Sequence, residues 1–279
     1  SDFAGGVSNG RRGLAAMEYL RDGLAARKAW FFLDDAVVCL GAGITCDAPE
    51  RVLTSVNQCA ANGPATVSAD HQPGQLSKGH SSVGPLEWVH HDGTGYVFLL
   101  PGKTTINIAM QSGTWHDVHH RESTQPVERD VFSLWIDHGA KPEGAQYAYA
   151  VFPDMSLDAM EGLYETPRVR IVGQSNELLA IVSHDGRLLQ AAFFEPGQVN
   201  WGDGRTLAVD APSLVMLDET MIFPYLHVCD PTQKRTTLRV RLSGHFNGAI
   251  YDETAQQREI AVPLPEGGSA GQTVDVNLW

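Results

Sequence analysis

Four titratable side chains lie close together in the segment GTWHDVHHRES, namely His116, Asp117, His119 and His120. Imidazole and carboxylate groups are common zinc ligands, but a structural site needs four of them around one ion. On a strand His116 and His120 would share one face while His119 would point the other way, so a metal site would need a ligand from elsewhere. We therefore predict no metal here, and surface or loop-anchoring histidines that titrate between about pH 5 and 8.

A second group combines aromatic and imidazole side chains on a predicted hairpin. Its members are Trp88, His90, His91 and Tyr96. A flat aromatic side chain with a polar tip can stack on the apolar face of a pyranose, which makes this group a candidate sugar-binding site. The alternative is a core tryptophan beside a solvated histidine pair.

Two further pairs complete the candidates, one of two aspartates and one of an aspartate and a histidine. Asp34 and Asp35 lie between apolar runs and are predicted to form a turn. Asp137 and His138 are expected at a strand end or loop that hydrogen bonds hold in place. The chain contains neither a G-x-S-x-G elbow nor a G-x-x-x-x-G-K-S/T loop, so serine hydrolase and P-loop chemistry are unsupported and no cofactor is expected.

The four cysteines are Cys39, Cys46, Cys59 and Cys229. They have no C-x-x-C spacing, which argues against a zinc or redox site. Cys46 and Cys59 flank a short loop and would form a disulfide in an exported protein. Buried free thiols are the alternative.

The charge balance limits the partners of the chain. Its 33 acidic and 20 basic side chains give a formal net charge of −13, which argues against nucleic acid. An acidic polymer would need a basic lining, but the densest basic stretches, 26–28 and 233–241, are expected to be solvated strand edges. No apolar run approaches the roughly 20 residues of a membrane span. Residue 1 begins no signal peptide, so any export signal was removed or lies upstream.

Short strands are the elements that must position these groups. The stretch KAWFFLDDAVVCLGAGI at 28–44 has two apolar runs around Asp34 and Asp35, which predicts a tight hairpin. Both of its faces are apolar, so we expect other β elements to cover both. Further strands are predicted at 87–91, 96–100, 104–110, 131–137 and 145–152, a surface loop at 62–85, and either a helix or β structure at 13–26.

The second half begins with a helical piece at 154–167. Seven strands are predicted after it, at 168–173, 178–184, 188–194, 213–217, 237–242, 259–264 and 273–278. They suit a smaller β-sandwich. The chain is thus expected to be all-β, with a large layered antiparallel domain at 1–166 and a β-sandwich at 167–279.

Several motifs resemble, in order, the polysaccharide lyases that cleave hyaluronan, chondroitin and xanthan (polysaccharide lyase family 8). They are GGVSNG at 5–10, KAWFFLDD at 28–35, LGAGI at 40–44, SVNQ at 55–58, DHGAKPEGAQYAYAVFP at 137–153 and DPTQ at 230–233. The resemblance covers nearly the whole chain and implies the central β domain, described as a supersandwich, followed by the C-terminal β domain. It does not choose the polymer.

The resemblance also implies a reaction. Such lyases open the C4–O link of a uronic acid by β-elimination, using an Asn, a Tyr, a His and several Arg residues. The family carries these in an N-terminal helical toroid and at the start of the central domain, so the catalytic residues are expected upstream of Ser1 and none is assigned here. This chain departs from the family at His119, where an Asn is usual, and His119 is a further candidate substrate-binding residue beside Trp88, His90, His91 and Tyr96.

The remaining implications concern partners and location. An acidic polysaccharide and the helical catalytic domain of the same precursor are the expected partners, and the protein is expected to be secreted or periplasmic. Because the family is exported, a Cys46–Cys59 disulfide is also expected. A free-standing carbohydrate-binding or structural β protein with the same fold but without the reaction is the alternative function.

Overall fold

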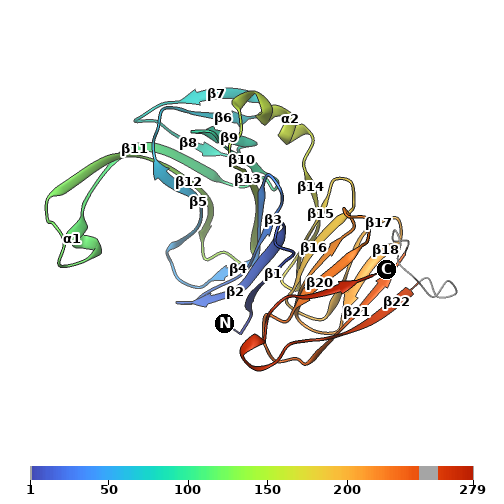
Figure 1. The fold of residues 1–279 in the computed structure, drawn as a ribbon. Coiled ribbons are helices and arrows are strands. Elements are labelled where there is room, and N and C mark those ends of the chain that lie inside the picture. The colour runs from blue at the N-terminus through green and yellow to red at the C-terminus, as the bar shows by residue number, and fades with distance from the viewer. Residues whose placement is uncertain (1, 245–256, 279) are drawn as a thin grey trace. The chain divides into compact units, whose positions relative to one another are not determined.

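The computed structural model describes residues 2–244 and 257–278, and most of them lie in antiparallel strands (Figure 1). The chain forms two compact units. The first comprises Ser1–Asp47, Glu143–Ala148 and Thr166–Trp279, and the second comprises Ala48–Pro142 and Tyr149–Glu165. The described helices are all too short to cross a membrane. The expected all-β fold class is therefore confirmed.

The first unit begins with four strands that pair in chain order. They are β1 (Ala4–Ser8), β2 (Gly13–Arg21), β3 (Leu24–Phe32) and β4 (Val37–Cys46), and the first half of β13 (Ala145–Phe152) follows β4 in the sheet. The ambiguous segment 13–26 is thus β2 and the start of β3. The β3–β4 hairpin is confirmed, with Phe32 opposite Val37 at its end.

The two faces of the β3–β4 hairpin differ in exposure. Phe31 is fully buried, whereas 43% of Phe32 is exposed. Trp30 is half-buried, and Lys28 places its ammonium nitrogen 5.5 Å from the Trp30 ring centroid. The expectation that both faces would be covered was therefore right for the Phe31 face and wrong for the other, where a long lysine stem does part of the covering.

The first unit also contains a β-sandwich. Its six-stranded sheet has the order β14 (Val169–Gln174), β15 (Leu178–Ser183), β16 (Leu188–Phe193), β19 (Ser213–Asp218), β20 (Tyr225–Cys229) and β23 (Val274–Asn277). Its four-stranded sheet has the order β17 (Gly197–Gly202), β18 (Arg205–Val209), β21 (Thr237–Ser243) and β22 (Gln257–Pro263), and η2 (Gly267–Ser269) precedes β23. The hydrophobic core lies between the two sheets.

Burial patterns show which strands are covered on both faces. In β21 the apolar residues alternate with exposed ones, as in a sheet with one solvated face. Every residue of β16 and β19 is buried, because these strands also contact β1 and β2 on their other face. The buried Gln190 ties these layers together, since its Nε2 donates to the carbonyl of Gly13 at 2.8 Å.

The DPTQ motif stabilises a loop through one buried carboxylate. Asp230 Oδ1 accepts from the backbone N–H and the hydroxyl of Thr232, at 2.8 and 2.6 Å. Its Oδ2 accepts the backbone N–H groups of Lys234 and Arg235, both at 2.8 Å. Burial acts to raise the pKa of Asp230, but these hydrogen bonds outweigh it and lower the pKa.

The second unit is built from two further sheets. One contains the second half of β13, then β10 (Thr94–Phe98), β9 (Trp88–His91), β6 (Ala65–Ala69) and β7 (Gln72–Leu76). The other has the order β5 (Arg51–Ala60), β12 (Pro126–Ala140), β11 (Thr104–Thr114) and β8 (Ser81–Gly84). The predicted helical piece is confirmed as η1 (Leu157–Ala159) and α2 (Met160–Glu165).

The segment 62–85 was predicted to be a loop, and that prediction was wrong because it contains β6, β7 and β8. Strand β7 reads QPGQL and is mostly exposed, so it has none of the alternating hydrophobicity that marks a strand. At the other limit of the unit, α2 ends at Glu165 and β14 of the first unit begins at Val169. The predicted domain boundary near residue 166 stays a prediction.

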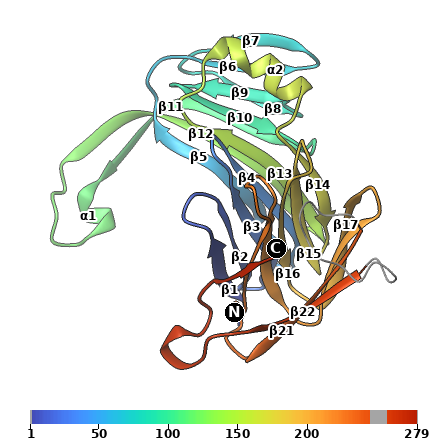
Figure 2. The ribbon, with the colours of Figure 1, turned by 45° about the vertical axis from the view of Figure 1, so that its right-hand side comes forward.

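A long hairpin of the second unit ends in a short helix. Strands β11 and β12 pair from Thr104 and Ile136 to Thr114 and Pro126, and α1 (Trp115–Val118) connects them. Strand β8 pairs with 104–107 and β5 with 131–140, so among the described residues the distal halves of β11 and β12 pair with each other alone. In both views α1 lies at the end of this hairpin (Figures 1 and 2).

Candidate functional site

The loop between β1 and β2 builds one wall of a pocket, and Asn9 holds the loop in shape. Asn9 Oδ1 accepts the backbone N–H groups of Arg11 and Arg12 at 3.0 and 2.8 Å, the pattern of an Asx turn. Its Nδ2 donates to Asp218 Oδ2 at 3.0 Å. One amide side chain therefore fixes the backbone of two arginines and joins the loop to the end of β19.

The Arg12 side chain is a structural member of this wall. Its Nε donates to Asp34 at 2.9 Å, its Nη1 donates to the Thr220 hydroxyl at 2.8 Å, and Asp218 lies 3.8 Å away. Only 15% of the side chain is exposed. The hydrogen bond from Arg12 holds the pKa of Asp34 below its usual value, and the same bond raises the pKa of Arg12.

Arg11 presents its guanidinium to solvent instead. Its Nε donates to Asp34 at 2.8 Å, and 73% of the side chain is exposed. Within the described part of the chain, neither terminal nitrogen of Arg11 has a hydrogen-bond partner. Arg11 is thus anchored at Nε while its outer edge remains free to donate to a ligand.

Strands β20 and β23 supply the opposite wall. His227 and Asp275 are directly paired in register, and His227 Nδ1 lies 2.6 Å from Asp275 Oδ1. The Tyr225 and His227 rings are stacked, with centroids 6.0 Å apart and planes 17° apart. The side chain of Asp275 is 60% exposed, whereas that of His227 is 7% exposed. The carboxylate therefore offers solvent-facing acceptor capacity beyond its bond to His227.

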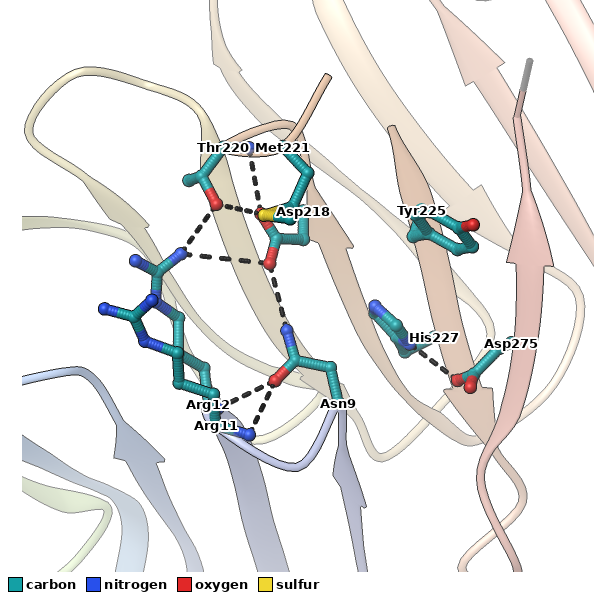
Figure 3. Close-up of a pocket in the computed structure, with 9 residues that line it drawn as sticks. All are labelled: Asn9, Arg11, Arg12, Asp218, Thr220, Met221, Tyr225, His227 and Asp275. Atoms are coloured by element: carbon teal, nitrogen blue, oxygen red, sulfur yellow. Dashed lines mark hydrogen bonds and ion pairs between the residues drawn. The ribbon is translucent and has the colours of Figure 1, made fainter. Parts of the chain in front are cut away.

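Together these walls enclose a pocket of about 340 Å³ within the first unit (Figure 3). Its lining consists of Asn9, Arg11, Arg12, Asp218, Thr220, Met221, Tyr225, His227 and Asp275. The guanidinium groups lie on one side and the Tyr225, His227 and Asp275 side chains on the other (Figure 3). The lining contains two guanidiniums and two carboxylates, so it has no net charge when His227 is counted as neutral.

The predicted sugar-binding group lies in the second unit, and most of it is buried. Trp88, His91 and Tyr96 are exposed by 5%, 1% and 2%. The Tyr96 hydroxyl accepts from Asn57 Nδ2 at 2.5 Å, and burial raises the pKa of Tyr96. His90 is half-buried, with Nε2 2.8 Å from the Met155 carbonyl. The burial of Trp88 favours a role in the core over stacking on a sugar ring.

His91 differs from the solvated histidine of that alternative. Its ring stacks on Phe132 with centroids 4.2 Å apart and planes 2° apart. Its Nε2 is buried without a hydrogen-bond partner in the described part of the molecule. Burial lowers the pKa of His91 and outweighs the opposing effect of the Asp92 carboxylate, while His90 adds a smaller lowering.

The His116–His120 cluster does not have the strand geometry considered for it, because α1 occupies this segment. Thr114 caps the helix, its hydroxyl accepting from the Asp117 N–H at 3.2 Å while the Asp117 carboxylate accepts from the Thr114 N–H at 3.0 Å. The helix and the following turn bring the His116 and His120 rings together, with ring centroids 5.6 Å apart. His119 is exposed and ends the helix. Residues 2–244 and 257–278 contain no group of three potential metal ligands.

The two further candidate pairs, Asp34 with Asp35 and Asp137 with His138, lie in segments held by local hydrogen bonds. Asp34 forms the turn after β3 and bonds both arginines of the pocket wall. Asp137 bonds the Arg51 guanidinium and the Gly139 N–H, the latter at 2.9 Å. Burial acts to raise the pKa of Asp137, but these bonds outweigh it and lower the pKa. His138 Nε2 lies 2.8 Å from the Thr54 hydroxyl.

The expected disulfide between Cys46 and Cys59 is not formed, since both side chains are thiols. Cys46 is the last residue of β4, whereas Cys59 lies near the far end of β5. A strand rises about 3.3 Å per residue, so the extended β5 carries Cys59 away from the start of its own strand. The alternative of free thiols holds, with Cys59 half-buried and the other three buried.

The residues that line the pocket were not among those predicted from the sequence. Asn9, Arg11 and Arg12 belong to or follow the GGVSNG motif, which was used only to recognise the family. The alternation of Tyr225 and His227 puts both on one face of a strand, a signal that could have been noticed. Their pairing with Asp275 depends on the register of β20 and β23, which the sequence does not display.

Two parts of this chain match the family models of known protein domains. Residues 1–164 match the model of the polysaccharide lyase family 8 super-sandwich domain, and residues 170–239 match that of its C-terminal β-sandwich domain. A chondroitinase-AC of Pedobacter heparinus is 33% identical over 99% of this chain and 38% of its own length. A hyaluronate lyase of Thermasporomyces composti is 31% identical over 85% of this chain and 31% of its own.

A solved structure agrees with these matches. A chondroitinase AC lyase, described in complexes with oligosaccharides, superimposes with a TM-score of 0.90 and 32% identity over 99% of this chain and 40% of its own. The chain thus spans between 31% and 40% of the length of these relatives. Two domain models matched in order, over more than half of the chain, show that it belongs to polysaccharide lyase family 8.

Proposed function

We propose that this chain is the β-sheet part of a lyase that cleaves a uronic-acid-containing polysaccharide by β-elimination. The observation that carries the proposal is the ordered match of both family 8 β domains. Relatives named chondroitinase-AC, hyaluronate lyase and xanthan lyase support this substrate class. They do not select one polymer, so hyaluronan, chondroitin and xanthan are all retained as substrates to be tested.

In this proposal the chain supplies a scaffold and one wall of the substrate cleft. β-Elimination needs a group that neutralises the uronate, a base for the C5 proton and an acid for the leaving oxygen, all within hydrogen-bond reach. Tyr96 and His91 have the right chemical types, but their burial keeps them from a polymer. We assign the proton transfers to a helical catalytic domain of the same precursor, and we propose a secreted or periplasmic location.

A non-catalytic carbohydrate-binding protein is the second candidate. The pocket beside Arg11 favours it, because its size and mixed polar lining suit a small ligand without requiring any catalytic group. The two candidates share the fold and differ in whether the protein that carries this chain turns substrate over.

Absorbance of the new double bond tests the proposal. The chain alone, its full-length precursor, and a mixture of the chain with the separately made helical part would each be incubated with hyaluronan, chondroitin sulfate and xanthan. We expect unsaturated product from the precursor and the mixture on at least one polymer, and none from the chain alone. Product from the chain alone would overturn the assignment of catalysis to another domain. A full-length precursor inactive on all three polymers would favour the second candidate.

A further inference from the structure

We propose that the pocket lined by Arg11, Tyr225 and Asp275, here called the Arg11 pocket, binds an uncharged, hydroxyl-rich pyranose ring. An N-acetylhexosamine of an alternating acidic polysaccharide belongs to this chemical class. The choice of polymer rests on the proposed function, whereas binding of the ring rests on the pocket itself.

The first wall is preorganised. Asn9 fixes the loop backbone, and the Arg12 guanidinium is held by Asp34 and Thr220. Thr220 is itself held, because its N–H and hydroxyl donate to Asp218 Oδ1 at 2.9 and 2.6 Å. A ligand that enters this pocket therefore meets groups already in place, which reduces the entropy lost on binding.

The groups left over match sugar hydroxyls. Arg11 offers its terminal N–H donors, and the exposed carboxylate of Asp275 offers acceptors. A hydroxyl both donates and accepts, so sugar hydroxyls suit both groups, which lie on opposite walls of the pocket (Figure 3). A carboxylate or sulfate group could itself bond only on the Arg11 side, since it has no hydrogen atom to donate to Asp275.

Charge gives the same preference. Arg11 and Arg12 are balanced by Asp218 and Asp275 in the lining, and Asp34 adds a further negative charge behind the two arginines. An anion in the pocket would gain from Arg11 but would be repelled by Asp275 and Asp34. An uncharged ring meets no such repulsion.

Apolar surface completes the site. The Tyr225 ring is partly exposed, and 65% of Met221 is exposed at the pocket. Aromatic rings with a polar tip and flexible thioethers suit the C–H face of a pyranose. The volume of about 340 Å³ lies at the lower end of the range for small-ligand pockets, which fits one ring of a polymer rather than a long segment.

Saturation-transfer NMR on the chain tests this proposal directly. The probes are tetrasaccharides of hyaluronan and of unsulfated chondroitin, together with N-acetylglucosamine, N-acetylgalactosamine and glucuronate as monosaccharides. We expect the strongest transfer on N-acetylhexosamine protons and weak transfer to glucuronate. Raising the salt from about 0.1 to 1 M should leave the affinity nearly unchanged, because screening acts on charges and not on an uncharged ring.

Two pocket variants and one control variant locate the site. Arg11→Ala should weaken binding about tenfold or more, the usual effect of losing a hydrogen bond to a charged group. Arg21→Ala is the control, because Arg21 is 74% exposed and also pairs with an aspartate, yet lies outside the pocket. Asp275→Ala should weaken binding to a similar degree.

Three outcomes would overturn the proposal. They are strongest transfer on the uronate ring, equal loss of binding in Arg11→Ala and Arg21→Ala, and absence of transfer to every probe. Each is independent of turnover, so failure of this proposal and failure of the lyase assignment are separate results.

Discussion

The buried imidazole of His91 should make the fold acid-sensitive. Only 1% of His91 is exposed, its ring stacks on Phe132, and burial lowers its pKa below the ordinary value. In the unfolded chain the same imidazole has a pKa of about 6.5. As the pH falls below that value the unfolded state takes up a proton that the folded state refuses, so the free energy of unfolding decreases.

The size of the effect follows from linkage. A site that stays neutral in the folded state while it is protonated in the unfolded state changes the free energy of unfolding by about 1.4 kcal/mol per pH unit. Between pH 6.5 and about 5.5 the contribution from His91 is therefore bounded at about 1.4 kcal/mol. In a protein of this size that corresponds to about 3–6 °C in Tm. The stabilisation is fully present above pH 6.5.

Thermal unfolding at pH 7.5 and about pH 5.5 measures this contribution in wild type and two variants. His91→Phe and His91→Leu both remove the titrating group, and using both guards against one side chain fitting the site poorly. The difference in Tm between the two pH values should shrink in each variant, by at most about 3–6 °C. His119→Gln is the control, since His119 is exposed and should leave that difference unchanged. An unchanged pH difference in both His91 variants would refute the reasoning.

Three further predictions concern packing, metals and thiols. Gly41→Ala should lower the free energy of unfolding by about 1–3 kcal/mol, because the new methyl would overlap the buried Tyr147 ring, whereas Gly113→Ala meets open space and should have little effect in the same urea titration. Chelator should leave Tm unchanged if the His116–His120 cluster holds no structural metal, and a shift of several degrees would contradict that expectation. Alkylation of the unfolded chain without reductant should label all four cysteines, and mass analysis showing only two labels would indicate a disulfide.

The sequence predicted the elements whose hydrophobic pattern is local. The β3–β4 hairpin was predicted because two apolar runs flank Asp34 and Asp35, and residues that tolerate turns are informative by themselves. Strand β7 was missed because an exposed edge strand needs no apolar face, and its Pro and Gly are typical of loops. Helix α1 could also have been predicted from local sequence, because Thr114 and Asp117 have the spacing of a capping box.

The site was less predictable because its parts are far apart in the chain. The register that pairs His227 with Asp275 joins β20 to β23, and Asn9 reaches Asp218 from the other end of the chain. Composition and spacing carry no record of such pairings. The histidine and aromatic residues of β9 and β10 drew notice for their chemical types, yet three of those four side chains are buried by the opposite sheet or their own neighbours. Burial, more than residue type, decided which candidates could meet a ligand.

The charge of the chain restricts how it can take part in binding an acidic polymer. With a net charge of −13 it repels a polyuronate at long range, and screening in about 0.15 M salt limits this repulsion to roughly 8 Å. Basic groups that neutralise uronates are then expected from another domain, in agreement with the proposed division of labour. A pocket of balanced charge can still add affinity by holding one uncharged ring of the polymer, because that contact requires no counter-charge. The chain would then bind the hydroxyl groups of an uncharged sugar ring, and another domain would bind the uronate.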